Sequence, residues 1–145
     1  NLVIAAVEGI SAVTSPYRQQ VKDFVQSCCP SQEAAGLLLE GIPGVYFVPG
    51  SMPESGFFCL LDFTAYRGMR YEDTVIEDDK SLLIYLFSRY RVNFITGSAI
   101  GWPDPDRIIA RISYSYEPEK IVRVFLYMKQ ELALLTRPFT ERGEP

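Results

Sequence analysis

The sequence predicts an α+β domain of two layers, with a short, mainly antiparallel sheet of about three strands covered by helices. Three short runs of apolar or alternating residues predict the strands. Stretches with apolar residues at helical spacing lie before, between and after them. A sheet of three strands needs a helical layer to be stable, so we expect the helices to pack on it. The 145 residues suffice for one domain with its own core.

The N-terminal third predicts helices. Apolar residues at helical spacing predict a first helix from residue 1 to about 13. Ser15 is a suitable N-cap and Pro16 a suitable first position for a second helix, which ends before Pro30. A third, short helix is expected over 31–39.

The middle third predicts a strand, a loop and a helix. The nearly continuous apolar run 57–63 is typical of a strand buried on both faces. The polar stretch 64–79 is expected to be a long loop. Asp78 or Asp79 would cap a helix over 80–90, whose predicted buried face carries Leu83, Leu86, Phe87 and Tyr90.

The last third predicts two strands and a helix. A strand over 92–96 leads into the turn-rich stretch 97–106, and a third strand follows over 107–115. Alternation in that strand places Ile108, Ala110, Ile112 and Tyr114 on one face, and Arg107, Ile109, Arg111 and Ser113 on the other. Pro118 begins a final helix with an apolar stripe formed by Ile121, Phe125, Met128, Leu132 and Leu135.

Composition excludes several classes of function. The net charge of −4 and the scattered basic residues argue against binding to nucleic acid. No apolar run reaches the roughly 18 residues of a membrane span, so no membrane association is expected. The absence of histidine removes Ser-His-Asp and Cys-His schemes and the commonest metal ligand, so no metal site is predicted. Cys28, Cys29 and Cys59 form no C-x-x-C pair and are expected to be small buried residues in a reducing cytosol.

Three sequence motifs follow one another in an informative order. "PESGFFCLLDF" is followed by "VNFITGSAIG" and then by "ARISYS", with an amphipathic helix at the end. This order resembles the C-terminal small domain of the fold-type I pyridoxal-phosphate (PLP) aminotransferases of class I/II, the aspartate aminotransferase-like group. The resemblance covers roughly 17–135. It implies an enzyme that transfers an amino group between an amino acid and a 2-oxo acid.

The resemblance implies that Arg111 binds the α-carboxylate of the substrate. A guanidinium offers a planar fork of donors that matches a carboxylate and stays charged when partly desolvated. The strand pattern alone favours a structural arginine that pairs with a nearby carboxylate, whereas the motif order favours the substrate role. Arg107 lies on the same face but at the start of the strand, which makes it the poorer candidate.

The resemblance also places the turn from Gly97 to Gly101 near the mouth of the substrate site, with Gly97, Ser98 and Ile100 beside it. Ile100 stands where the family often has an aromatic residue. An ordinary tight connection would need the same glycines. The acidic run 77–79 is interpreted as complementing a helix dipole. The loop with Tyr66, Arg67, Arg70 and Tyr71 is expected to be solvated.

The family's PLP-binding lysine has no counterpart here. Lys22, Lys80, Lys120 and Lys129 lie in or near predicted helices, and none follows a Ser-x-Ser pattern. In the family, that lysine and the other cofactor contacts belong to a large domain. We therefore expect residues 1–14 to be a connecting helix from a missing large domain, 15–136 the small domain, and 137–145 a flexible tail. No catalytic, cofactor-binding or metal-binding residue is expected in this fragment, which alone would be inactive.

The partners that the resemblance implies are amino-acid and 2-oxo-acid substrates, the large domain and a second copy in a homodimer, in the cytoplasm. Two alternatives stay open from the sequence. The same fold serves PLP-dependent lyases, decarboxylases and synthases. A stand-alone binding module that kept the fold and lost catalysis is the other alternative.

Overall fold

The computed structural model describes residues 19, 20, 23, 27, 36, 39–51 and 58–138. The helices predicted over 1–13, 16–29 and 31–39 therefore lie almost wholly outside the described residues, as do the predicted connecting helix over 1–14 and most of the predicted tail. The described positions 19, 20, 23, 27, 36 and 39 are all helical.

The main sheet has four strands and is antiparallel throughout. Its order is β1 (Tyr46–Phe47), β2 (Phe58–Asp62), β6 (Ile109–Ser113) and β5 (Ile95–Thr96). The central β2–β6 pair runs over five residues on each strand, whereas each edge strand has only two. The predicted α+β class and antiparallel sheet are confirmed, and β1 is a fourth strand that was not predicted.

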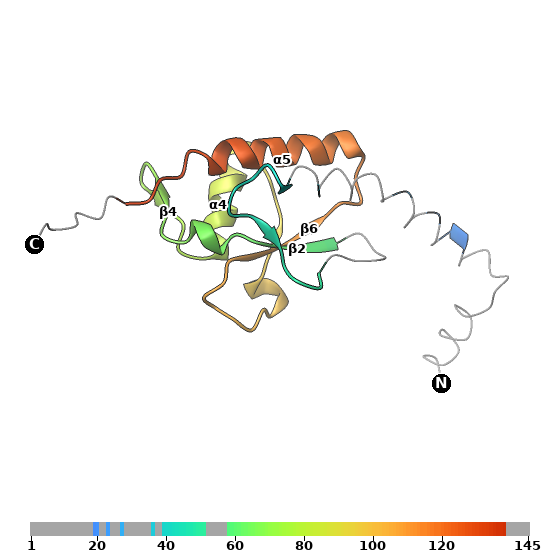
Figure 1. The fold of residues 1–145 in the computed structure, drawn as a ribbon, viewed down its shortest axis with the longest axis horizontal. Helices are drawn as coiled ribbons and strands as arrows, with labels where there is room; N and C mark the ends of the chain where they lie inside the picture. Colours follow the sequence, from blue (N-terminus) through green and yellow to red (C-terminus); the bar gives the residue numbers. More distant parts are fainter. Residues whose placement is uncertain are drawn as a thin grey trace, which may run out of the picture.

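Two helices form the second layer, as Figure 1 shows. Helix α4 (Asp79–Tyr90) and helix α5 (Pro118–Leu132) lie on the same side of the β2–β6 pair. The predicted apolar stripe of α5 is confirmed, because Ile121, Phe125, Met128, Leu132 and Leu135 are all buried. The core joins these side chains to one face of the sheet, with Cys59 and Leu61 from β2 and Ala110 and Ile112 from β6.

The predicted alternation along β6 is also confirmed. Ala110 and Ile112 belong to the core, whereas Arg111 and Ser113 are half-buried on the opposite face. We call this second face the outer face; it carries Tyr46, Phe58, Leu60, Asp62, Ile95, Ile109, Arg111 and Ser113, of which Ile109 is fully buried. Neither α4 nor α5 covers it.

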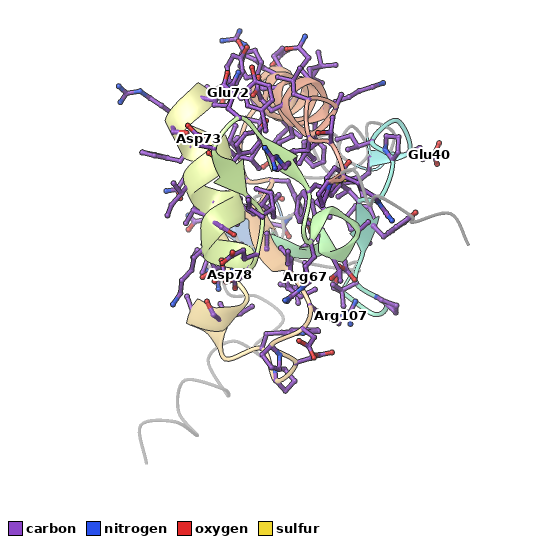
Figure 2. All side chains as sticks on the ribbon, turned by 90° about the vertical axis from the view of Figure 1, so that its left-hand side faces the viewer. Glu40, Arg67, Glu72, Asp73, Asp78 and Arg107 are labelled. Atoms are coloured by element: carbon purple, nitrogen blue, oxygen red, sulfur yellow. The ribbon has the colours of Figure 1, made fainter. Side chains whose placement is uncertain are left out.

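Helix α4 begins as predicted but buries a different face. The Asp78 carboxylate accepts the N–H of Ser81 at 2.8 Å, and the Ser81 hydroxyl accepts the N–H of Asp78 at 2.9 Å, which completes a capping box. Figure 2 shows Asp78 at this end of the helix. The predicted stripe was wrong at its C-terminal end: Phe87 and Tyr90 are exposed, and the buried hydrophobic positions are Leu82, Tyr85 and Leu86.

Tyr85 lies on the buried face instead. Its hydroxyl donates to the backbone carbonyl of Glu131 on α5 at 2.9 Å. A buried tyrosine normally satisfies its hydroxyl in this way.

The predicted loop over 64–79 is in fact structured. It contains a short 3₁₀ turn (Thr64–Tyr66) and a hairpin of β3 (Arg70–Tyr71) and β4 (Thr74–Val75). Tyr66 is buried and its hydroxyl donates to the carbonyl of Pro43. The expectation of a solvated loop was wrong for Tyr66 and Tyr71, which pack into the domain, whereas Arg67 and Arg70 are exposed as expected.

Cys59 is a buried free thiol within β2, as expected. Burial raises its pKa to about 12, so the thiolate form is strongly disfavoured. Cys28 and Cys29 lie outside the described residues. In the described part of the chain, no helix combines the length and the hydrophobicity that crossing a membrane requires.

Candidate functional site

Arg111 lies at the centre of the outer face. Its Cα is paired with that of Leu60 on β2 and that of Ile95 on β5. Residues paired across an antiparallel sheet project to the same face, so Arg111 has an apolar neighbour on each side. Neighbouring strands hold it on both sides, which fixes the position of its backbone more firmly than a loop would.

The guanidinium of Arg111 stacks on an aromatic ring. Its Cζ lies 4.5 Å from the centre of the Phe58 ring. Phe58 is paired with Ser113, so it is the diagonal neighbour of Arg111 on the outer face. An arginine over an aromatic face keeps its charge and still has the edge of its planar fork available for hydrogen bonds.

The side-chain hydrogen-bond donors of Arg111 have no acceptor among the described residues. Its Nε is buried and has no hydrogen-bond partner among the described residues. None of the ion pairs between described residues involves Arg111. Nearly all buried donors in proteins have a partner, so this nitrogen points to a group that the described residues do not supply.

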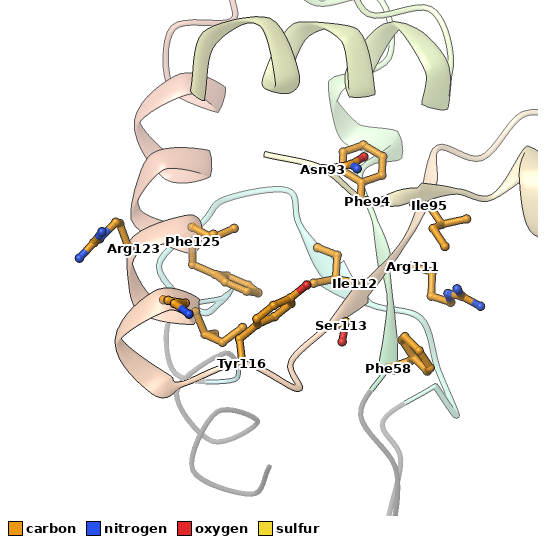
Figure 3. Close-up of a pocket in the computed structure, with 13 residues that line it drawn as sticks. Phe58, Asn93, Phe94, Ile95, Arg111, Ile112, Ser113, Tyr116, Arg123 and Phe125 are labelled. Atoms are coloured by element: carbon orange, nitrogen blue, oxygen red, sulfur yellow. The ribbon is translucent and has the colours of Figure 1, made fainter. Parts of the chain in front are cut away.

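A cavity of about 380 Å³ adjoins Arg111. It opens beyond the last β5–β6 pair, Ile95 with Arg111, where the two strands separate. Figure 3 shows Arg111 and Phe58 on one side of β6, with Tyr116 and Phe125 on the other. The lining is mostly apolar, and its charged members are all basic: Arg111, Lys120 and Arg123. Lys120 is paired with the exposed Glu117 at 2.8 Å, so Arg111 and Arg123 are the members of this lining without an ion-pair partner among the described residues, and their charge favours an anionic ligand.

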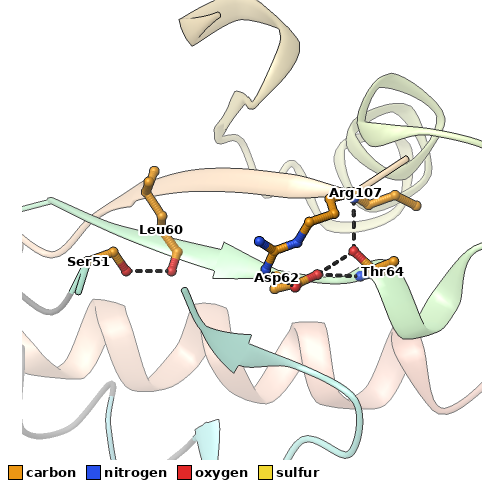
Figure 4. A network of polar contacts seen from close by, with 6 residues as sticks. Ser51, Leu60, Asp62, Thr64 and Arg107 are labelled. Carbon is orange, nitrogen blue, oxygen red and sulfur yellow. Dashed lines mark hydrogen bonds and ion pairs between the residues drawn. The ribbon is translucent and has the colours of Figure 1, made fainter. Parts of the chain in front are cut away.

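Arg107 has a structural role instead. Its Nη2 forms an ion pair with Asp62 Oδ2 at 2.5 Å, and its guanidinium lies 5.6 Å from the Trp102 ring centre. Figure 4 shows the network around this pair. Asp62 also accepts the N–H and the hydroxyl of Thr64, at 2.8 and 2.5 Å, and that hydroxyl accepts the N–H of Ile108 at 3.0 Å.

These contacts set the ionisation of Asp62. Burial by itself raises the pKa of this carboxyl, but the hydrogen bonds from Thr64 and Arg107 and the charge of Arg107 outweigh burial. The pKa of Asp62 therefore lies below its usual value. The strand pattern alone favoured a carboxylate partner for Arg111, but among the described residues it is Arg107 that has one, and Arg111 does not.

The turn that the sequence placed beside the site follows β5 directly. Gly97 precedes a 3₁₀ turn (Ser98–Ile100), and Gly101 ends it in the left-handed region, at φ 75°. The Gly97 N–H donates to the carbonyl of Ile109 at 2.7 Å. A Cβ on Gly97 would meet the Cβ of Ile109 at 2.9 Å, so only glycine allows this close approach to β6.

Asp79 fastens this turn to the helical layer. Its Oδ2 accepts the N–H of Ser98 at 2.6 Å, and its Oδ1 accepts the Ser98 hydroxyl at 3.2 Å. The carboxylate is buried, with Asp79 only 7% exposed. The acidic run 77–79 predicted only a helix-dipole role, and the contact with Ser98 is an additional one that the sequence did not indicate.

Of the predicted site residues, Arg111 lines the cavity, whereas Gly97, Ser98 and Ile100 belong to the turn that follows β5 and are not among the residues that line it. Arg111, Ile95 and the start of the turn at Gly97 lie along the β5–β6 boundary, and Ile100 is the partly exposed apolar side chain of the turn, at 37%. Ser98 is held by Asp79. The role of each residue toward a ligand stays a prediction.

A second polar cluster lies away from the site, between α4 and α5. Arg89 forms an ion pair with the buried Glu131 and lies 4.6 Å from the centre of the Tyr71 ring. Burial, followed by the negative charge of Glu131, raises the pKa of Tyr85 to about 12. This cluster joins the two helices to the β3–β4 hairpin and does not reach the outer face.

No family model matches the sequence. Among solved structures, the chain is similar to aspartate aminotransferase from Rhizobium meliloti, with a TM-score of 0.67 and 20% identity over 77% of this chain and 26% of that one. It is similar to an aminotransferase from Escherichia coli, with a TM-score of 0.57 and 20% identity over 74% and 24%. For alanine aminotransferase from Pyrococcus furiosus, the TM-score is 0.64, with 16% identity over 86% and 28%.

These similarities show a shared fold. The resemblance to aminotransferases that the sequence motifs predicted is thus confirmed at the level of the fold. The chain spans only about a quarter of the length of the three matched proteins.

Proposed function

We propose that this chain is the substrate-carboxylate-binding small domain of a PLP-dependent aminotransferase, which transfers an amino group between an amino acid and a 2-oxo acid. The observation that carries the proposal is the state of Arg111. It is central on the outer face, stacked on Phe58, and has a buried Nε without a partner among the described residues. The aminotransferase-like fold supports the same function.

The role of Arg111 in this proposal is to bind and orient. Its fork of donors matches both oxygens of a carboxylate, and partial burial strengthens the interaction. The ring of Phe58 holds the guanidinium plane, and β2 and β5 hold its strand. A ligand fixed in this way presents the bonds at its α-carbon in one orientation, which is catalysis by positioning.

The described residues do not fit the PLP cofactor itself. The described lysines are Lys80, Lys120 and Lys129; all three are exposed, and Lys120 pairs with Glu117 at 2.8 Å. When bound, PLP supplies an electron sink for the α-carbon. The residues that hold it would belong to a large domain of a longer protein, which the proposal requires together with the predicted homodimer and cytoplasmic location.

The test is a substitution of Arg111 in that longer protein. Arg111→Lys keeps the charge but loses the fork, so we expect KM for both the amino acid and the 2-oxo acid to rise by about ten- to a hundredfold. Arg107→Lys is the matched control, because it changes the same residue type on the same strand where the partner is Asp62. We expect it to lower stability and to leave KM within about twofold.

Two results would contradict the proposal. One is an Arg111→Lys enzyme whose steady-state kinetics equal those of the wild type. The other is a 145-residue chain that shows lysine-linked PLP absorbance and turnover without any further domain.

A further inference from the structure

The cavity that Arg111 lines extends from the sheet to the first half of α5, and most of its wall is apolar. Four buried apolar side chains contribute to this wall: Phe94, Ile112, Ile121 and Phe125. Three exposed aromatic or aliphatic side chains also line it, and Figure 3 labels all three: Phe58, Ile95 and Tyr116. An apolar lining with a few polar groups is typical of sites for small molecules.

The size of the cavity indicates what kind of ligand it can take. Its volume of about 380 Å³ is near the lower end of the roughly 300–1,000 Å³ that small-molecule sites occupy. An α-helix with its side chains is about 10 Å across, so a folded partner could insert only single side chains here. A small molecule with an apolar chain, by contrast, can fill the space and bury its own apolar surface.

The charges around the cavity favour a carboxylate as the polar end of that molecule. Arg111 has a buried Nε without a hydrogen-bond partner among the described residues, and its planar fork of donors matches two carboxylate oxygens. Lys120 is paired with Glu117 at 2.8 Å, and Arg123 is exposed on α5. Arg111 is thus the basic group that offers both a buried donor and a fixed position on a strand.

The same lining disfavours an additional amino group on the ligand. The charged side chains among the described lining residues are all basic, so an ammonium group meets repulsion and no carboxylate. The hydroxyl of Ser113 is already engaged, since its Oγ lies 2.8 Å from the Oγ of Ser115 and accepts the Ser115 N–H at 3.3 Å. The cavity therefore suits a plain carboxylate better than an amino acid.

We propose that this cavity binds a medium-chain monocarboxylate, with the carboxylate on Arg111 and the apolar chain against Phe94, Ile121 and Phe125. The inference rests on the proposed carboxylate role of Arg111, and it adds a ligand that is not the amino-acid substrate. Because both ligands need Arg111, binding of the medium-chain carboxylate excludes the amino acid from that group. The cavity thus gives the longer protein a site for inhibition by such carboxylates.

The experiment uses the 145-residue chain and carboxylates of increasing length: acetate, butanoate, hexanoate and octanoate. Dissociation constants are taken from the chemical shifts of the Arg111 Nε–H and of the amides of 93–95, 112–113 and 120–125 in an NMR titration. We expect each added methylene to tighten binding about three- to fourfold, because it enters an apolar wall. A fifth probe, 2-aminohexanoate, has the chain and carboxylate of hexanoate plus an ammonium group, and it should bind at least about fivefold more weakly than hexanoate.

Four variants locate the ligand. Val124 is half-buried and lines the cavity, so Val124→Phe should fill it and abolish the dependence on chain length, with acetate binding within about twofold of the wild type. Val122→Phe is the matched control, because Val122 is half-buried on the same helix but does not line the cavity, and it should keep the dependence. Arg111→Lys should weaken all four carboxylates alike, whereas Arg123→Gln should change each constant by less than about twofold.

Two results with the wild type alone would overturn the inference, whether or not every variant folds. One is octanoate that binds no more tightly than acetate. The other is 2-aminohexanoate that binds as tightly as hexanoate, which would assign the cavity to an amino-acid side chain instead.

The variants add three further contradictions: Val124→Phe keeps the dependence on chain length, Val122→Phe abolishes it equally, or Arg123→Gln weakens binding more than Arg111→Lys does. Each of these five results leaves the proposed function intact, provided that Arg111→Lys still weakens the binding of acetate. If no carboxylate shifts the Arg111 Nε–H of the wild type, both the proposed carboxylate role and the inference fail.

Discussion

Asp62 pairs with Arg107 on the outer face. Arg111, four residues after Arg107 on the same face, has no carboxylate partner among the described residues. Two arginines thus lie on the same face of the sheet in different environments. One is neutralised and fixed by its neighbours, and it joins the strand start to the end of β2. The other, Arg111, stacks on Phe58 and has a buried Nε without a hydrogen-bond partner among the described residues.

Ionised Asp62 stabilises the folded chain, and this contribution depends on pH. Its pKa is lower in the folded chain than the ordinary value of 3.8, so the stabilisation is complete above that value and is lost as the pH falls through the folded pKa. We expect the free energy of unfolding to fall below about pH 4, and Asp62→Asn to show a shallower fall. Urea denaturation at a series of pH values measures both curves. Parallel curves for the two proteins would show that Asp62 is not the group responsible.

The Arg89–Glu131 pair is expected to respond asymmetrically to substitution. Glu131 is 3% exposed, whereas Arg89 reaches solvent. Glu131→Gln removes the buried charge and keeps a polar group, so it should cost about 1 kcal/mol of unfolding free energy. Arg89→Met leaves the buried carboxylate unpaired and should cost more than Glu131→Gln.

Urea denaturation at neutral pH compares these two variants. Lys120→Gln is the control, because it breaks the exposed pair with Glu117 and should leave stability unchanged. An Arg89→Met protein more stable than Glu131→Gln would contradict the asymmetry.

Replacing Gly97 or Gly101 is expected to lower the stability of the fold, for a different reason at each position. Gly97→Ala introduces a Cβ against Ile109 and should cost about 1–3 kcal/mol of stability. Gly101 has open space around it but a φ of 75°, so Gly101→Ala should cost about 1 kcal/mol through backbone strain.

Asparagine distinguishes the two causes, because it tolerates the left-handed region. Gly101→Asn should recover part of the loss, whereas Gly97→Asn should be no better than Gly97→Ala. Thermal unfolding of the four variants gives the comparison. Recovery at Gly97 would show that crowding against Ile109 is not the cause there.

The sequence could predict the parts of this fold that depend on local periodicity. The alternation of β6 assigned Ile108, Ala110 and Ile112 to the core and Arg111 to the other face, because a period of two follows from strand geometry alone. The stripe of α5 followed in the same way from the period of 3.6. For Arg111, the central position was therefore predictable, whereas the ring of Phe58 under its guanidinium depends on strand register.

Other features depend on contacts that no local pattern records. Strand β1 and the β3–β4 hairpin have two residues per strand, which is too short for a period to be visible. The buried face of α4 includes Tyr85, whose hydroxyl donates to the Glu131 carbonyl 46 residues away, a contact that the helical period does not indicate. Asp79 could be identified as a helix-terminal acid, but its contact with Ser98 becomes evident only after the chain has folded.

The two edge strands of the main sheet have a consequence for association between copies. β1 and β5 each have only two residues, although they flank a central pair of five. A short edge presents few free backbone groups to a strand from another molecule, which is a common protection against edge-to-edge aggregation. The domain can therefore keep an open face with exposed Tyr46, Phe58 and Ile95 at low risk of growing into a continuous intermolecular sheet.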